Sequence, residues 1–457
     1  MFQKSINKIK ISIVMKKVIT ILLLIIAQFC VYSQNPICPT GVYIPDPSAH
    51  VWKDGKLYVY GSLDESTNYY CSHKHHVLST SDMKTWELTE NSFASKGESD
   101  QVSYSDDFLY APDVQYKKGK YYLYYCLSSA SNNEGVATST SPTGPFLNGK
   151  VLYTKGINEI DPCVFMDTDG QAYYIWGQFT AKVAKLKPNM IEIDTTTIKD
   201  RVVTESEHHF HEGGYMVKRK GIYYFVYAAL DKTGSANCIS YSTAKSPFGP
   251  FKYGGIIISN DHCNPGNWNN HGSLVEFKGQ WYVFYHRSTH GTPFMRRACV
   301  EPIYFNKDGS INEVEMTSQG AGSPLSAFEK IEAERACLLL GNVRIEAYDS
   351  DQEKLTKINN GDKACYKYID FGNGADSVTI RIATKEKPGK LRFNIGVFEK
   401  QTVAEVTIPG NGDGKIWQKI TVKANGVKGI HAVWLQFEGD GSDLFDLDWF
   451  VFSKRTV

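Results

Sequence analysis

The sequence predicts an all-β protein in which a five-bladed β-propeller precedes a β-sandwich of the jelly-roll type. The first observation is an internal repeat of five β-hairpins. Their turn glycines, 51 to 64 residues apart, are Gly55, Gly119, Gly170, Gly221 and Gly279. Strand-rich units repeated at such a spacing are typical of blades, because one unit cannot bury both faces but five arranged radially can. The second observation is an aromatic content of 13%, with 28 Tyr, which favours strands. The third is a Gly/Ser/Pro stretch near residue 321, followed by further short alternating strands.

The same local pattern predicts each hairpin. A short apolar strand runs into a glycine turn, and an aromatic strand leads away from it. The aromatic strands expected in the five blades are residues 57–60, 121–125, 173–176, 223–227 and 281–285. The endings at 139–146 and 240–251 share a Ser-Pro turn followed by Gly-Pro-Phe, so they predict equivalent outer strands in two blades.

The domain boundaries follow from composition. Residues 1–34 carry five lysines and then the apolar run 18–29, which is typical of a signal peptide and too short for a stable membrane span. The propeller is expected over 35–320, a linker over 321–330 and the sandwich over 331–457. We therefore expect an exported protein, periplasmic or extracellular, with no integral membrane segment after cleavage.

Charge and cysteine usage exclude several function classes. The formal net charge of +1 gives no reason to expect a nucleic-acid partner. Ten cysteines are present without a Cys-x-x-Cys pair, so most are expected to be buried thiols rather than metal or redox sites. No motif indicates an organic cofactor.

Acidic residues recur in register with the repeat. Asp46, Asp161 and Glu212 each lie nine residues before their glycine, His271 lies eight before, and Asp113 lies six before. Because the first strand of every propeller blade lines the central channel, these side chains are expected to meet near the axis. Carboxylates gathered in a concave site point to catalysis. The alternative is that each acid caps a turn, as Asp-Pro often does. For Asp113 the two readings stay open.

The ordered set of motifs resembles glycoside hydrolase family 43, whose members are five-bladed propeller enzymes. The residues that carry the resemblance are Asp46-Pro47, Ala111-Pro112-Asp113, Asp161-Pro162, His211-Glu212-Gly213 and Asn270-His271-Gly272. The resemblance implies Asp46 as general base, Glu212 as general acid, and Asp161 as the group that orients the acid and adjusts its pKa. It further implies that Arg296 contacts the sugar, with Arg297 as the alternative, and that His271 lies at the axis beside an ion or water.

Two aromatic residues are candidate sugar contacts. Tyr110 stands where family members often carry Trp before Ala-Pro-Asp, and it keeps a flat face on which a sugar can stack. Trp176 is a candidate stacking platform in the third blade, with a role in the core as the alternative.

The C-terminal part resembles a family 6 carbohydrate-binding module. Ile331-Glu332-Ala333-Glu334 opens it, and Phe445-Asp446-Leu447-Asp448-Trp449 nearly closes it. The resemblance implies a structural calcium held by Glu332, Glu334 and Asp448, because oxygen ligands suit this ion; the alternative is that these acids cap strand ends. Cys365 stands where such modules usually carry a binding aromatic, with Trp417 as the expected second ring, so glycan binding by this domain is not favoured.

The activity implied is inverting hydrolysis of a glycosidic bond in an oligo- or polysaccharide. Glu212 would protonate the leaving oxygen and Asp46 would activate a water, which requires roughly 6.5–9.5 Å between the carboxyl groups. The resemblance implies an α-L-arabinofuranosidase or a β-xylosidase. The C-terminal binding-type module and the expected export favour the arabinofuranosidase, acting on arabinoxylan or arabinan. A β-xylosidase and a β-galactofuranosidase remain as alternatives, and a sugar-binding propeller without turnover is the alternative from another class.

Overall fold

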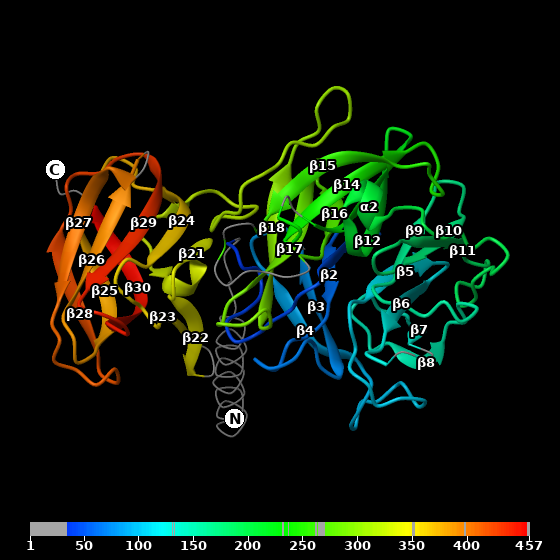
Figure 1. Ribbon diagram of the computed structural model, residues 1–457, viewed down its shortest axis with the longest axis horizontal. Coiled ribbons are helices and arrows are strands. Elements are labelled where there is room, and N and C mark those ends of the chain that lie inside the picture. The colour runs from blue at the N-terminus through cyan, green and yellow to red at the C-terminus, as the bar shows by residue number, and fades with distance from the viewer. Residues whose placement is uncertain are drawn as a thin grey trace, which may run out of the picture.

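The computed structural model describes residues 34–454, except 130, 132, 231, 232, 236, 261, 262, 264–269, 350, 351, 397 and 398. The predicted signal peptide therefore lies almost wholly outside the described residues. The chain forms two halves, a propeller and a sandwich, which lie side by side in Figure 1. Among the described residues, no helix combines the length and apolar character needed to cross a bilayer.

Five antiparallel sheets make up the propeller, each a meander in which consecutive strands pair. Blades one and two are β1 (Ser48–Val51), β2 (Leu57–Gly61), β3 (Lys74–Thr80), β4 (Glu87–Ala94), and β5 (Asp113–Lys117), β6 (Lys120–Cys126), β7 (Glu134–Ser139), β8 (Leu147–Val151). Blade three is β9 (Cys163–Met166), β10 (Ala172–Trp176) and β11 (Lys182–Lys185). Blades four and five are β12 (Phe210–Arg219), β13 (Ile222–Ala229), β14 (Cys238–Ala244), β15 (Lys252–Ser259), and β16 (Ser273–Phe277), β17 (Gln280–Ser288), β18 (Arg296–Ile303), with the short helix α2 (Glu205–His208) before β12.

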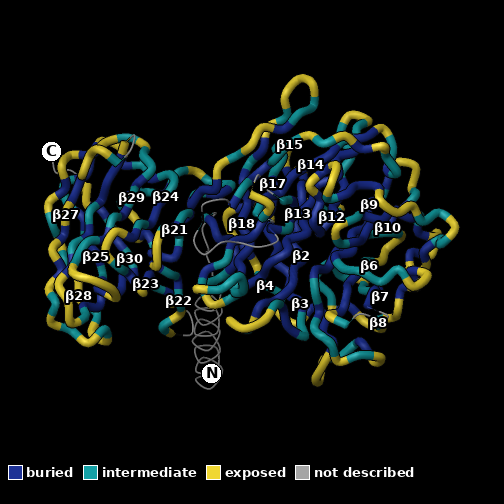
Figure 2. Tube along the Cα trace, in the orientation of Figure 1, coloured by how far each residue is buried: buried dark blue, intermediate teal, exposed yellow. Residues whose placement is uncertain are grey.

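The repeat predicted from the glycines is visible in the backbone. Gly55, Gly119, Gly170, Gly221 and Gly279 all have φ between +76° and +86°, a conformation that glycine adopts without steric cost. Each therefore supports the tight turn between the first two strands of its blade. Apolar side chains of neighbouring blades pack between the sheets, so the blades bury one another. Figure 2 shows the inner strands buried and the outer loops exposed.

The ring closes through the first described residues. The Ile37 backbone N–H donates to the Ala298 carbonyl at 2.9 Å, and the Asn35 amide donates to the Val300 carbonyl at 3.0 Å. The chain start is thereby tied to β18 of the last blade. This contact holds the first and last blades together, as a closed ring requires.

The C-terminal half is a sandwich of two six-stranded sheets. One sheet contains β19 (Leu325–Ser326), β21 (Leu338–Leu340), β24 (Lys363–Asp370), β26 (Gly389–Ile395), β27 (Gln401–Ile408) and β29 (Ile430–Gly439). The other contains β20 (Ile331–Glu332), β22 (Arg344–Asp349), β23 (Gln352–Thr356), β25 (Ala375–Thr384), β28 (Trp417–Lys423) and β30 (Phe445–Lys454), and the 3₁₀ turn η1 (Ala333–Arg335) follows β20. One buried apolar cluster fills the space between the sheets.

The expected linker over 321–330 is wrong in part. Leu325 and Ser326 form β19, which pairs in parallel with β24, and Leu325 is buried in the sandwich core. The reason is that Leu325 adds apolar area to that core, and burial of such area outweighs the Gly/Ser/Pro composition around it.

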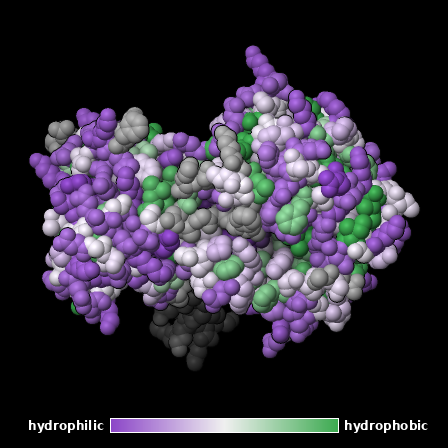
Figure 3. Space-filling view, viewed as in Figure 1, coloured by the Kyte–Doolittle hydropathy of each residue, from purple (hydrophilic) through white to green (hydrophobic). Residues whose placement is uncertain are grey.

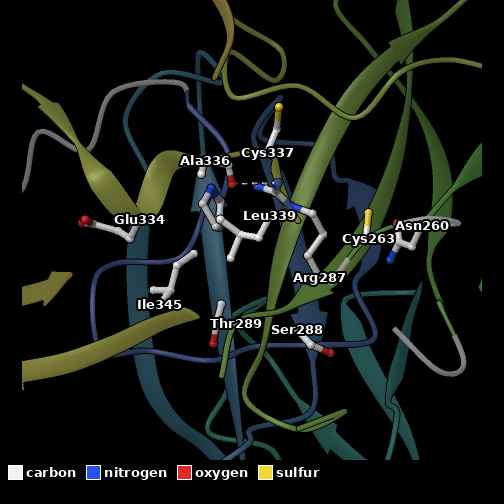
Figure 4. Close-up of a pocket in the computed structure, with 11 residues that line it drawn as sticks. Asn260, Cys263, Arg287, Ser288, Thr289, Glu334, Ala336, Cys337, Leu339 and Ile345 are labelled. Carbon is white, nitrogen blue, oxygen red and sulfur yellow. Dashed lines mark hydrogen bonds between the residues drawn. The ribbon is translucent and has the colours of Figure 1, made fainter. Parts of the chain in front are cut away.

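The two halves share a polar, buried interface. Arg297 of β18 donates to Glu353 of β23 at 2.5 Å, and the Tyr43 hydroxyl donates to the same carboxylate at 2.7 Å. Arg287 donates to the Ala336 carbonyl at 3.1 Å, and both residues line a cavity of about 30 Å³ (Figure 4). The sandwich is therefore docked on the propeller rather than tethered to it. Figure 3 shows mainly hydrophilic residues over the visible face of the sandwich, with larger hydrophobic patches on the propeller.

Candidate active site

A pocket of about 240 Å³ lies where the first strands of the blades converge. Asp46, Asp161 and Glu212 all line it, and each is at most 6% exposed. They come from the first, third and fourth blades. The other residues that line it are Tyr70, Cys71, Tyr110, Ala111, Ile160, Gln178, His271 and Arg296. The structure therefore brings together the three acids that the repeat placed in register.

Both Asp-Pro motifs adopt the same unusual backbone. Asp46 has φ 56° and Asp161 has φ 59°, and non-glycine residues rarely have a positive φ. Strain of this kind collects at functional sites, where the surrounding structure compensates for it. The shared conformation turns each carboxylate from the start of its blade into the pocket.

Asp46 is held from both sides. The Ser62 hydroxyl donates to its Oδ2 at 2.8 Å, and Arg296 Nη1 donates to its Oδ1 at 3.0 Å. Its backbone N–H donates to His286 Nδ1 at 3.0 Å. Arg296 is itself fixed by Asp64, whose two oxygens accept from Nε and Nη2, each at 2.9 Å. This bidentate pair is buried, which gives the guanidinium one defined orientation beside Asp46.

Glu212 is positioned by the turn after β10. The Gln178 amide donates to Glu212 Oε2 at 2.7 Å, and His211 Nε2 lies 4.0 Å from the same oxygen. Both groups therefore face the same carboxylate oxygen, Oε2. Gly213, at φ 63°, packs directly under the His271 ring, where an added Cβ would come within 2.6 Å of that ring. The glycine is required because the backbone and the imidazole occupy adjoining space.

An ion pair between the buried Lys182 and the half-buried Glu159 supports this turn. The Gln178 backbone N–H donates to Glu159 Oε2 at 2.6 Å. The Lys182 ammonium, with its side chain 4% exposed, pairs with the other oxygen of Glu159. The pair therefore fixes the residue that contacts Glu212.

The titration of Asp161 is perturbed by its surroundings. Burial, reinforced by the neighbouring Glu212 and Asp46 carboxylates, raises the pKa of Asp161 well above its usual range. His271 Nδ1 lies 3.7 Å from Asp46 Oδ1 and 3.8 Å from Asp161 Oδ2. Burial lowers the pKa of His271, so it faces the two acids as a neutral ring. The Glu212 and Asp46 carboxylates near Asp161 favour retention of a proton within the cluster.

The remaining site predictions divide into those near the pocket and those away from it. Tyr110 lines the pocket, and burial raises its pKa to about 12, so it contacts the cavity as a neutral phenol. Between the two arginines, Arg296 lines the pocket, whereas Arg297 points to Glu353 of the sandwich. Successive residues of a strand point to opposite faces, which explains the division.

Trp176 is a correction. Its side chain is 0% exposed and packs in the core between blades two and three, and its indole N–H donates to the Ile157 carbonyl. It cannot stack on a sugar there, because neighbouring side chains cover its ring. Asp113 has a structural role and does not line the pocket. It accepts hydrogen bonds from His50, Ser48 and the Val164 backbone N–H, and these bonds hold neighbouring blades together.

Sequence reasoning missed Asp64, Gln178, Glu159 and Tyr70. Asp64, Tyr70 and Gln178 lie between the second and third strands of their blades, and Glu159 lies just before the first strand of blade three. All four are outside the repeated acid positions. Only the position of Gln178, two residues after the aromatic strand of the acid-bearing third blade, offered a signal. The Arg296 guanidinium also makes a cation–π contact with Tyr70, at 4.7 Å from the ring centroid.

The acids predicted to bind calcium line one cavity of the sandwich. Glu332, Glu334 and Asp448 border a space of about 280 Å³. Glu334 Oε2 is buried and has no partner among the described residues, and burial raises the pKa of Glu334 to about 8. Such an orphaned oxygen fits a cation. Against this, Glu332 pairs with Lys330 and Asp448 with Arg381, and no group of three potential ligands converges within the described part of the chain. The donor chemistry fits calcium, but the present placement does not complete a site.

Comparison with known proteins places the chain. Residues 33–311 match the model for glycosyl hydrolases family 43, and residues 332–454 match that for the carbohydrate binding module (family 6). The chain belongs to glycosyl hydrolase family 43. The family and the two-part fold predicted from the sequence, a five-bladed propeller and a β-sandwich, are thereby confirmed.

Individual members of the family show how far the similarity extends. A xylosidase/arabinosidase from Thermoclostridium stercorarium is 30% identical over 89% of this chain and 96% of its own length. An arabinoxylan arabinofuranohydrolase from Bacillus subtilis is 29% identical over 76% of this chain and 75% of its own. The solved structure of a family 43 arabinoxylan arabinofuranohydrolase from Bacillus subtilis, in complex with cellotetraose, has a TM-score of 0.55 at 26% identity, covering 93% of this chain and 99% of that one. The similarity therefore spans both halves.

Proposed function

We propose that this family 43 glycoside hydrolase removes pentose residues from plant cell-wall polysaccharide, acting as an inverting α-L-arabinofuranosidase on arabinoxylan or arabinan. One observation carries the proposal: three buried carboxylates from separate blades line one pocket. Relatives named xylosidase/arabinosidase and arabinoxylan arabinofuranohydrolase support the pentose. A β-xylosidase is the second candidate, because the first of these relatives carries both activities in its name.

We propose a part in the reaction for each of the three acids. Glu212 gives the proton on Oε1 to the leaving oxygen while Gln178 holds Oε2. Asp46, with Ser62 and Arg296 bonded to its oxygens, takes a proton from the water that attacks the opposite face of the sugar. Asp161 adds a carboxylate beside Glu212 and thereby favours proton retention in the pocket. Direct attack by water inverts the anomeric centre.

Chromogenic aryl glycosides test the activity. We expect the purified protein to hydrolyse 4-nitrophenyl α-L-arabinofuranoside faster than the corresponding β-D-xylopyranoside and β-D-galactofuranoside. The Asp46→Ala variant is the control, and it should lose about 10³-fold or more, because the attacking water loses its base. Hydrolysis of none of the three glycosides would refute the proposal, and a preference for the xyloside would select the second candidate.

Substitution of the proposed acid gives a sharper test. Glu212→Ala should reduce kcat on an arabinoxylo-oligosaccharide by roughly 10²–10⁴-fold. It should affect 2,4-dinitrophenyl glycosides much less, since that leaving group departs without a proton. Equal losses on both substrates would assign the proton to another residue. The product anomer, followed by NMR at early times, reports inversion.

We also propose calcium binding at the sandwich cavity, where Glu332, Glu334 and Asp448 would supply oxygen ligands. When bound, the ion would neutralise these acids and join both ends of the domain. Millimolar CaCl₂ should raise the Tm of the wild-type protein by several degrees over EDTA, and Glu334→Gln should abolish the rise. An equal rise in the variant would rule out this site.

We also propose that the enzyme is exported from the cytoplasm. The basic residues and apolar run of the first 34 residues support export. Fractionation of expressing cells, followed by N-terminal sequencing, tests it. We expect the mature chain to begin near residue 34, and an uncleaved chain in the cytoplasm would contradict the assignment.

A further inference from the structure

The turn after β10 presents an exposed aromatic ring next to the proposed acid. Phe179 is 51% exposed, and its ring meets that of His211 edge-on, with 5.2 Å between the centroids. Its backbone N–H donates to the His211 carbonyl at 2.6 Å. Its neighbour Gln178 holds Glu212. The ring therefore packs on His211, whose Nε2 lies 4.0 Å from Glu212 Oε2.

The turn is rigid and its conformation is costly. Four bonds pin consecutive residues: Gly177 N–H to Ile160 O, Gln178 N–H to Glu159, Phe179 N–H to His211 O, and Glu205 N–H to Phe179 O. Phe179 has φ 60°, a left-handed conformation that is a genuine outlier for a bulky residue. Packing of the core does not explain why this large apolar side chain is exposed to solvent in a strained backbone conformation. Such strain is typical of sites that grip a ligand.

We propose that Phe179 forms the subsite for the leaving group, and that this subsite binds the apolar face of a pyranose in a β-linked xylose chain. This inference rests on the proposed function. A general acid must touch the leaving oxygen, so the sugar that departs lies on the side of Glu212. Equatorial hydroxyls leave the two faces of a xylose ring lined by C–H groups. An exposed aromatic face can stack on such a surface and bury apolar area of both rings.

Three variants separate ring stacking from packing. Phe179→Ala removes the ring, and Phe179→Tyr keeps it. Tyr304→Ala removes an unrelated ring that is 62% exposed. Tyr304 follows the last residue of β18, whose first residue is Arg296 of the pocket, so it lies about 25 Å away along an extended strand. Thermal unfolding of all three checks that the fold is intact.

Two substrates report the subsite through turnover. The first is an arabinoxylo-oligosaccharide, whose leaving group is a xylose chain, and the second is methyl α-L-arabinofuranoside, whose leaving group is methanol. We expect Phe179→Ala to lower kcat/KM about tenfold on the oligosaccharide and less than about twofold on the methyl glycoside. Phe179→Tyr and Tyr304→Ala should match wild type on both. Equal loss on the two substrates would show that the ring only packs on His211, and it would overturn the proposal.

A binding measurement tests the same subsite without turnover. Calorimetry with xylotetraose should show binding to the wild type weakened about tenfold by Phe179→Ala and unchanged by Tyr304→Ala. The sandwich is the same in all proteins, so the difference isolates the ring. Unchanged affinity in Phe179→Ala overturns the subsite even if the enzyme is active. If the wild type hydrolyses neither substrate, the proposed function fails, while this difference in affinity still decides the subsite.

Discussion

Arg296 is the residue on which the charges of the pocket depend. Its guanidinium is 2% exposed and bonds both oxygens of Asp64, one oxygen of Asp46 and the face of Tyr70. A buried cation is stable only when it is paired. Asp64 therefore does two things at once: it neutralises Arg296 and it directs one N–H at Asp46. Removing it leaves a guanidinium that competes for Asp46 alone.

We expect Asp64→Asn to lower both stability and activity. Loss of the bidentate partner should cost about 3 kcal/mol in the free energy of unfolding and roughly 10²-fold in kcat/KM, because Arg296 loses its defined orientation. Denaturant unfolding and aryl-glycoside kinetics measure the two effects. Glu65→Gln is the matched control, since its pair with Lys74 is exposed. An Asp64→Asn enzyme as active as wild type would show that Arg296 needs no such anchor.

At the scale of elements, the site is built from the starts of the first strands and from the turns that follow the second strands. Asp46 and Asp161 precede their first strands, and Glu212 lies within β12 at a register shift between Glu212 and Tyr215. Such a bulge redirects a side chain from the sheet. The second strands end at the same face and supply Gln178. Behind them, Glu134, the first residue of β7, is fully buried and accepts from the Tyr174 hydroxyl.

Glu134 should make stability depend on pH. Burial raises its pKa from 4.5 to about 8, so between these values the folded protein keeps a proton that the unfolded chain has released. The free energy of unfolding then falls as pH rises through this window, by up to roughly 1.4 kcal/mol per pH unit. Glu134→Gln removes this dependence. We expect the Tm of the variant to gain on wild type from pH 5 to pH 8. A constant difference in Tm over that range would contradict the raised pKa.

At the scale of the whole molecule, the sandwich is a fixed part of the enzyme. Arg297 and Glu353 have fully buried side chains and join β18 to β23. Arg335 adds bonds to the carbonyls of Gln34 and Pro36, beside the segment that closes the ring. The strand that presents Arg296 to the pocket is thus anchored from the sandwich side by its next residue.

Breaking this anchor should destabilise the whole protein. Glu353→Ala leaves Arg297 buried without its carboxylate, which should cost about 3–5 kcal/mol. We expect a single calorimetric transition for the wild type, with a lower Tm or a split into two transitions for the variant. Glu346→Ala on the neighbouring strand is the control, because its pair with Lys357 is partly exposed. A Tm equal to that of the wild type in both variants would mean that the ion pair contributes nothing to docking.

The sequence predicted most of the fold and the acids of the site. The glycine repeat and the aromatic strands are local patterns, and local patterns specify hairpins. The register of Asp46, Asp161 and Glu212 within that repeat predicted their convergence, because equivalent positions of blades point to one axis. The sandwich was also visible in its short alternating strands, although β19 was mistaken for part of a linker.

Contacts between distant segments could not be predicted in the same way. Asp64 and Arg296 are separated by 232 positions, and no periodicity relates them. Trp176 reads equally well as a sugar platform or as core, and only the packing of blade two against blade three buries it. The division of labour between Arg296 and Arg297 depends on strand register, since a shift of one residue exchanges the faces.

The amino-acid order by itself determined the blade, the number of its copies and the position of an acid in three of them, because these follow from short-range patterns repeated along the chain. Only the tertiary structure decided which polar groups hold those acids, which aromatic rings reach solvent, and how firmly the sandwich is docked. Those features depend on which surfaces meet when the ring closes, and burial, pairing of charges and strand register fix them only in the folded molecule.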